Sequence, residues 1–145
     1  MARTITASPN PLPLIAGHFV EGANYNTWRP QGTRDYLLLL TITGQGRIGW
    51  ANGETRINAG EVCLLRPGAS HDYGTAPGAD RWELLWTHFL PRPHWFALLD
   101  WPEIAPEVCR LTLGVNTAEV HAALADMNRR TKAVCPAATI GRCTL

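Results

Sequence analysis

Long apolar runs and an excess of one charge are both missing from this sequence of 145 residues. No stretch approaches the roughly 18–20 consecutive apolar residues that a membrane-spanning helix needs, so no contact with a membrane is expected. The N-terminus has one arginine but no long apolar segment behind it, which argues against a secretion signal and indicates a cytoplasmic protein. The formal net charge of +1 gives no general electrostatic attraction to nucleic acid.

Clustered metal ligands are missing as well. The cysteines include no pair at Cys-x-x-Cys spacing, and neither cysteines nor histidines gather at the spacing of a zinc site. We expect all of the cysteines to be reduced structural residues: Cys63, Cys109, Cys135 and Cys143. The sequence therefore predicts no metal and no other cofactor.

Motifs of phosphate binding and of nucleophilic catalysis are also absent. Gly44-Gln45-Gly46 lacks the spacing and the following helix of a phosphate-binding loop. His71 and His88 have no adjacent nucleophile motif such as Gly-x-Ser-x-Gly. We expect a protein that is not an enzyme.

What is present is a series of short strand-like runs separated by turn residues. Ala51-Asn52-Gly53 predicts a hairpin, and Gly44-Gln45-Gly46 predicts another turn. Runs separated by about 8–12 residues are typical of an antiparallel barrel or sandwich. Strands are expected over residues 36–43, 47–50, 55–58, 62–65 and 82–89.

The two ends of the chain have a different pattern. Prolines at alternate positions make residues 1–15 an expected N-terminal arm, and residues 16–110 follow as the barrel. A short helix is expected over 94–100, an amphipathic helix over 118–130 and a further helix over 137–145. The expected helical segment, 111–145, ends without a capping glycine, so we expect the natural protein to continue.

Four side chains of the strand 82–89 lie on one face, because strand residues alternate between faces: Trp82, Leu84, Trp86 and His88. Two indoles in a barrel interior can be simple core, which would leave a dimerisation module with a vestigial pocket. They can equally be a platform for a flat ligand or for the apolar face of a sugar ring. Arg29 at a barrel mouth can donate to a sugar hydroxyl or a carboxylate, or can be a surface residue. Tyr73, in an expected turn over 71–73, is either a ligand donor or a packing residue.

Gly60, Gly68 and His71 have the spacing of the second half of a cupin motif, whose histidine holds a metal in cupin enzymes. The first half needs His-x-His and a glutamate on an earlier strand, and residues 34–40 contain no histidine. His71 is therefore interpreted as a structural residue. The alternative is a small cupin enzyme acting on a sugar, which would need a bound metal or an acid–base pair in its cavity.

An ordered set of motifs over residues 17–102 resembles the N-terminal ligand-binding and dimerisation domain of the AraC-type transcription regulators. The set comprises Leu-x-Leu-Thr-Ile-x-Gly-Gln-Gly (38–46), Gly60-Glu61, Arg66-Pro67-Gly68, His71-x-Tyr73-Gly74, Arg81, Trp86, Phe89 and Trp101-Pro102. The resemblance implies a mainly β fold, a cupin-like (jelly-roll) antiparallel β-barrel without metal, followed by C-terminal α-helices. It also implies a homodimer, a sugar effector such as L-arabinose covered by the N-terminal arm, and a helix-turn-helix DNA-binding domain beyond residue 145.

The resemblance also implies roles for individual residues. Arg29, Tyr73 and Trp86 stand at positions where the family contacts the sugar, and Asn24 stands near the position of a contacting threonine. Leu84 stands where the family has a histidine, which leaves one sugar hydroxyl without its partner at a cost of roughly 1–3 kcal/mol. Either the ligand differs from arabinose, or a water or His88 supplies the missing contact.

Overall fold

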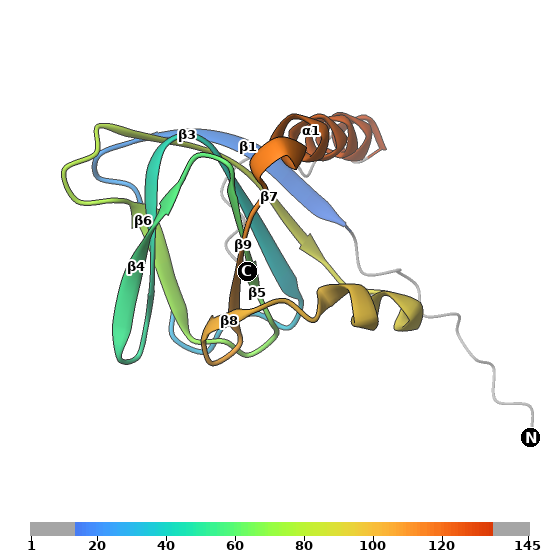
Figure 1. The fold of residues 1–145 in the computed structure, drawn as a ribbon, viewed down its shortest axis with the longest axis horizontal. Coiled ribbons are helices and arrows are strands. Elements are labelled where there is room, and N and C mark those ends of the chain that lie inside the picture. Colours follow the sequence, from blue (N-terminus) through green and yellow to red (C-terminus); the bar gives the residue numbers. More distant parts are fainter. Residues whose placement is uncertain (1–13, 135–145) are drawn as a thin grey trace, which may run out of the picture.

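The structure, a computed structural model, describes residues 14–134 as a β-sandwich with one long helix packed on its outside (Figure 1). The strands run from residue 15 to residue 112 and the C-terminal helical part from 114 to 134. The strands are β1 (Ile15–Gly22), β2 (Asn26–Arg29), β3 (Tyr36–Trp50), β4 (Gly53–Asn58), β5 (Glu61–Leu65), β6 (His71–Thr75), β7 (Arg81–Phe89), β8 (Glu103–Ala105) and β9 (Val108–Thr112). The helices are the 3-10 helices η1 (Pro93–Leu99) and η2 (Gly114–Asn116) and the α-helix α1 (Thr117–Val134).

Strand β3 joins the two sheets of the sandwich. Its first part pairs with β5 and β7 in a sheet of order β1-β7-β3-β5-β9-β8, and its second part pairs with β4 and β6. Strand β2 extends the second sheet by pairing with β6, and all of these pairings are antiparallel. The mainly β, cupin-like antiparallel fold with a C-terminal helix is confirmed.

The predicted turn over residues 44–46 is wrong, because β3 continues through it as one strand. The register shifts between Thr41 and Thr43, and Gly44 has a φ of 73°, a conformation that favours glycine. A Cβ on Gly46 would lie 2.3 Å from the Trp82 indole, so only glycine fits there. The two glycines bend the chain from one sheet into the other instead of reversing it.

A second correction concerns residues 71–73, which form part of strand β6 rather than a turn. This strand pairs on one side with β2 and on the other with β3, where Tyr73 faces Ile48. Pairing with two neighbours outweighs the local preference of a polar, glycine-flanked segment for a turn. The hairpin at residues 51–53 is confirmed, with Trp50 paired to Gly53.

Two apolar clusters lie on opposite sides of the first sheet. The inner cluster fills the space between the sheets and includes Leu39, Ile48, Trp82, Leu84 and Trp86. The outer cluster is centred on Leu40, Val62 and Leu85, and α1 covers it with Val120 and Leu124. Neighbouring residues of β7 therefore belong to different clusters, as the alternation of a strand requires.

Several predictions concern residues that the structure does not describe: the arm up to residue 13, the helix over 137–145, Cys135 and Cys143. Cys63 and Cys109 are buried free thiols, as expected, and burial raises the pKa of Cys63 to about 12. Within residues 14–134, no helix is long and apolar enough to cross a membrane. The same residues contain no group of three or more His, Cys, Asp or Glu side chains that could hold a metal ion.

Candidate ligand-binding site

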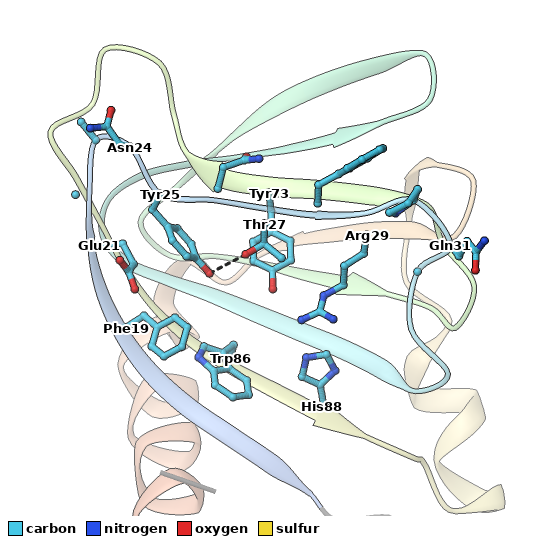
Figure 2. Close-up of a pocket in the computed structure, with 16 residues that line it drawn as sticks. Phe19, Glu21, Asn24, Tyr25, Thr27, Arg29, Gln31, Tyr73, Trp86 and His88 are labelled. Carbon is cyan, nitrogen blue, oxygen red and sulfur yellow. Dashed lines mark hydrogen bonds between the residues drawn. The ribbon is translucent and has the colours of Figure 1, made fainter. Parts of the chain in front are cut away.

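An open pocket of about 1200 Å³ lies between the two sheets of the sandwich (Figure 2). It is bordered by β1, β2 and the turn between them, with contributions from β6 and β7. Strands β1 and β2, together with the residues that directly follow each of them, supply most of its lining, whereas β6 supplies one residue and β7 two. The side chains with aromatic or polar chemistry are Phe19, Glu21, Asn24, Tyr25, Asn26, Thr27, Trp28, Arg29, Gln31, Tyr73, Trp86 and His88.

Tyr25, directly before β2, and Thr27 and Arg29 within it form a polar row facing the inside. They occupy alternate positions, and all three are partly buried while Asn26 and Trp28 between them are exposed. The Thr27 hydroxyl donates to the Tyr25 hydroxyl oxygen over 3.3 Å (Figure 2). Burial raises the pKa of Tyr25 to about 12, which keeps this phenol protonated at neutral pH.

Tyr73 is placed against this row by the pairing of β6 with β2, in which it faces Thr27. Its side chain is 6% exposed, and its hydroxyl interacts with Arg29, Thr27 and Tyr25. Burial raises the pKa of Tyr73, and the nearby Arg29 charge opposes that shift without reversing it. The hydroxyl is therefore a neutral group, able both to donate and to accept.

Trp86 forms an aromatic wall of the pocket together with Phe19. Gly17 faces Trp86 across the β1–β7 pair, and the indole lies so close to the glycine that a Cβ there would be 2.3 Å from a ring atom. The Phe19 ring meets the indole edge-on, with centroids 5.3 Å apart. The indole Nε1 is buried and finds no hydrogen-bond partner within residues 14–134. A bound ligand can supply that partner.

His88 follows two residues after Trp86 on the same face of β7 and also borders the pocket. Its Nδ1 lies 2.9 Å from Oδ1 of Asp35. Its ring meets the indole of Trp86 in a T-shaped arrangement with centroids 5.8 Å apart. A histidine thus stands at one end of the aromatic wall.

The structure brings together three of the residues singled out in the sequence, since Arg29, Tyr73 and Trp86 all border this pocket. Asn24 borders it too, but from the exposed turn between β1 and β2, and Figure 2 shows its side chain far from Trp86. It is therefore a rim residue.

Trp82 and Leu84 do not border the pocket, which corrects the expectation that both would face a ligand. Both side chains are 0% exposed, within the inner cluster. The Trp82 indole donates from Nε1 to Oγ1 of Thr41 over 3.0 Å. The rings of Tyr25 and Tyr73 pack against it at centroid distances of 6.2 and 6.3 Å. The two tyrosines therefore take the surface that Trp82 would otherwise offer.

His71 lies behind Tyr73 rather than in the pocket lining. The two rings stack with centroids 5.6 Å apart, and the His71 Nδ1 lies 2.7 Å from the carbonyl oxygen of Ala69. A carbonyl only accepts, so Nδ1 carries the proton. Burial lowers the pKa of His71, which favours this neutral form.

Several pocket residues were missed in the sequence, among them Phe19, Glu21, Tyr25 and Thr27. The period-two alternation of Tyr25, Thr27 and Arg29 was a usable signal, because every second residue of a strand faces the same side. The short length of β2 and its polar composition made this segment resemble a loop.

Comparison with known proteins agrees with this architecture. The family model described as the AraC-like ligand binding domain matches residues 12–137. The chain is similar to the arabinose operon regulatory protein of Escherichia coli (strain K12), with 41% identity over 76 residues that cover 52% of this chain and 26% of that protein. The protein of the same name from Salmonella typhimurium is 43% identical over 77 residues, 52% of this chain and 27% of that protein. The match thus spans about a quarter of the length of these relatives.

Among solved structures, ToxT from Vibrio cholerae O395 is similar in fold, with a TM-score of 0.58 at 9% sequence identity. The match covers 80% of this chain and 46% of that one. Because the family model covers most of the sequence, the chain belongs to the AraC-like ligand-binding domain family, a family of binding domains rather than of enzymes.

Proposed function

We propose that this chain is the effector-binding part of an AraC-family transcription regulator, and that its effector is a small sugar, L-arabinose or a close relative. The observation that carries the proposal is the meeting of Arg29, Tyr73 and Trp86 in one pocket. The similarity to two arabinose operon regulatory proteins supports the same ligand class.

The chemistry of the pocket suits a compact, neutral ligand with many hydroxyl groups. Trp86 and Phe19 offer an aromatic surface for the C–H face of a sugar ring. Arg29 can donate to hydroxyl oxygens, and the hydroxyls of Tyr25 and Tyr73 can donate or accept. The Glu21 carboxylate, which also borders the pocket, can accept from a sugar hydroxyl and disfavours an anionic ligand nearby.

A long apolar ligand is a weaker fit. One ToxT structure is described as bound to an unsaturated fatty acid, but that protein is about 10% identical to this chain, which speaks for the fold alone. Polar side chains from β1, β2, β6 and β7 line this pocket, and an alkyl chain would leave several of them unpaired.

In the whole regulator we place a DNA-binding helix-turn-helix domain beyond residue 145 and a homodimer contact in the helical segment. Binding of the sugar would then shift the balance between two arrangements of the protein, and DNA occupancy would follow. Such a regulator acts on DNA in the cytoplasm. The formal net charge of +1 gives the present chain alone no general electrostatic attraction to DNA.

Isothermal titration calorimetry tests the effector class directly. The purified chain is titrated with the neutral sugars L-arabinose, D-xylose, D-galactose and L-fucose. Galacturonate is added as a sugar with a carboxylate, and an unsaturated fatty acid as an apolar ligand. We expect heat of binding with at least one neutral sugar. Heat with the fatty acid or with galacturonate alone contradicts the proposal, and so does the absence of heat with every neutral sugar.

A further inference from the structure

His88 has one ring nitrogen paired with a carboxylate, and the residue borders the pocket. Its side chain is 3% exposed, and Nδ1 lies 2.9 Å from Oδ1 of Asp35. The residue lies on the same face of β7 as Trp86, at the border of the pocket, so the rest of its ring is within reach of a bound ligand.

The Asp35 contact decides what the second nitrogen can do. A carboxylate accepts hydrogen bonds, so the proton of the neutral imidazole resides on Nδ1. Nε2 then carries a lone pair and acts as an acceptor. Asp35 lies in the connection before β3, outside the set of residues that border the pocket, so it orients His88 without touching a ligand.

The surroundings of His88 define where a ligand group would meet Nε2. The ring stands at the edge of the Trp86 indole, with centroids 5.8 Å apart. Figure 2 shows the guanidinium of Arg29 extending from β2 toward the same ring. A sugar stacked on Trp86 would present one edge to both groups. A hydroxyl at this edge could donate to His88, while a different oxygen of the sugar accepts from Arg29.

We infer that His88, oriented by Asp35, is a specificity-determining residue that accepts a hydrogen bond from one hydroxyl of the bound ligand. The inference rests on the proposed function, because it requires a ligand that carries hydroxyl groups. It adds a selection rule: the ligand must offer a proton at this position. A deoxy sugar, an O-methyl sugar and a deoxyfluoro sugar all lack that proton and should be rejected alike.

Calorimetry with a set of modified sugars tests the inference. The best neutral sugar for the unmodified chain is compared with its deoxy and deoxyfluoro derivatives, one ring position at a time. For one position we expect both derivatives to bind about 10- to 100-fold more weakly. In His88→Phe the parent sugar should weaken by a similar factor, and the penalty at that one position should disappear.

His18 supplies a matched control, because it is also a histidine paired with a carboxylate, that of Glu83. His18 does not border the pocket. His18→Phe should bind the sugars like the unmodified chain. If His88→Phe does not fold, as judged by circular dichroism, His88→Asn is used with the same sugars.

Nitrogen-15 NMR of the histidine rings gives a second readout that does not depend on a variant. We expect Nδ1 of His88 to be protonated, and the Nε2 resonance to shift when the sugar binds. Asp35→Leu should remove the fixed tautomer and weaken binding about 3- to 30-fold, as expected of a positioning residue.

The outcomes separate the two proposals. Two outcomes overturn the role of His88 alone, provided that the unmodified chain binds a neutral sugar. In the first, the modified sugars lose as much affinity in His88→Phe as in the unmodified chain. In the second, the Nε2 resonance does not respond to the sugar. Absence of binding to every neutral sugar overturns both. A single position whose penalty disappears only in His88→Phe supports the inference.

Discussion

Gly17 of β1 and Trp86 of β7 face each other across the strand pair, and the indole occupies the space that a side chain at residue 17 would need. A Cβ on Gly17 would lie 2.3, 2.4 and 2.7 Å from three neighbouring indole atoms. The aromatic wall of the pocket therefore depends on the absence of a side chain on the adjacent strand.

Gly17→Ala is expected to displace the Trp86 indole and weaken binding of the sugar at least tenfold, because the methyl group and the ring cannot share this space. Val20→Ala is the control on the same strand, since Val20 is exposed and does not border the pocket. Calorimetry and near-ultraviolet circular dichroism check both variants. Equal affinities for the two variants would contradict this account of the wall.

Trp86→Ala is expected to cost at least about 2 kcal/mol of binding free energy, roughly 30-fold in affinity, because the sugar loses its aromatic platform. His71→Ala should leave most of the affinity, since His71 lies behind Tyr73 and does not border the pocket. The same titrations measure both. A larger loss in His71→Ala than in Trp86→Ala would show that the pocket has been assigned to the wrong residues.

Residues with strong local signals were predictable, and those placed by distant partners were not. The alternation of β7 correctly grouped Trp82, Leu84 and Trp86 on the inner side of the sheet. The alternation of side chains shows which residues of a strand share a face, but it does not show which of them face the pocket and which are covered by other side chains. The tyrosines that close the space over Trp82 come from β6 and from the residue before β2, neither of which was recognised as a strand.

The placement of His71 and Tyr73 shows the same limit. Their segment pairs with two other strands, β2 and β3, that are far away in the sequence. Nothing in the local composition indicates such a partner, so turn preferences dominated the prediction. The resemblance to a known protein family singled out Arg29, Tyr73 and Trp86. Composition and spacing alone left the roles of these residues open.

Thr41→Val is expected to lower the free energy of unfolding by about 1–3 kcal/mol, because it leaves the buried Trp82 N–H without its acceptor. Sugar affinity should change less than about twofold, since neither Thr41 nor Trp82 borders the pocket. Urea unfolding followed by tryptophan fluorescence measures the first effect, and calorimetry measures the second. A large loss of sugar affinity in a stably folded Thr41→Val protein would show that Trp82 contributes to ligand binding.

Protonation of His71 should destabilise the protein below neutral pH. Burial lowers the pKa of His71 from 6.5, so the folded state favours the neutral ring. As pH falls below 6.5, His71 of the unfolded chain gains a proton while His71 of the folded protein stays neutral. The free energy of unfolding is therefore unaffected by this group above 6.5 and decreases below 6.5, until the pH has passed the lower pKa of the folded state. The slope from this one group is at most about 1.4 kcal/mol per pH unit.

Urea unfolding at several pH values between about 5 and 7 checks this expectation, and His71→Phe should flatten the dependence there. Glu83→Gln is the control. Hydrogen bonds from Thr43 and His18 lower the pKa of Glu83 from 4.5, so its stabilising effect is lost only at more acidic pH. An unchanged slope in His71→Phe would show that other groups cause the sensitivity.

Leu85 and Trp86 are consecutive in the chain but belong to opposite sides of the sheet. Leu85 lies in the cluster covered by α1, and Trp86 borders the pocket. The partition between the pocket and the helix is therefore a single layer of strands, with no intervening core. One rigid peptide unit joins the two residues, so a movement of β7 at this point would shift the pocket wall and the surface under α1 together.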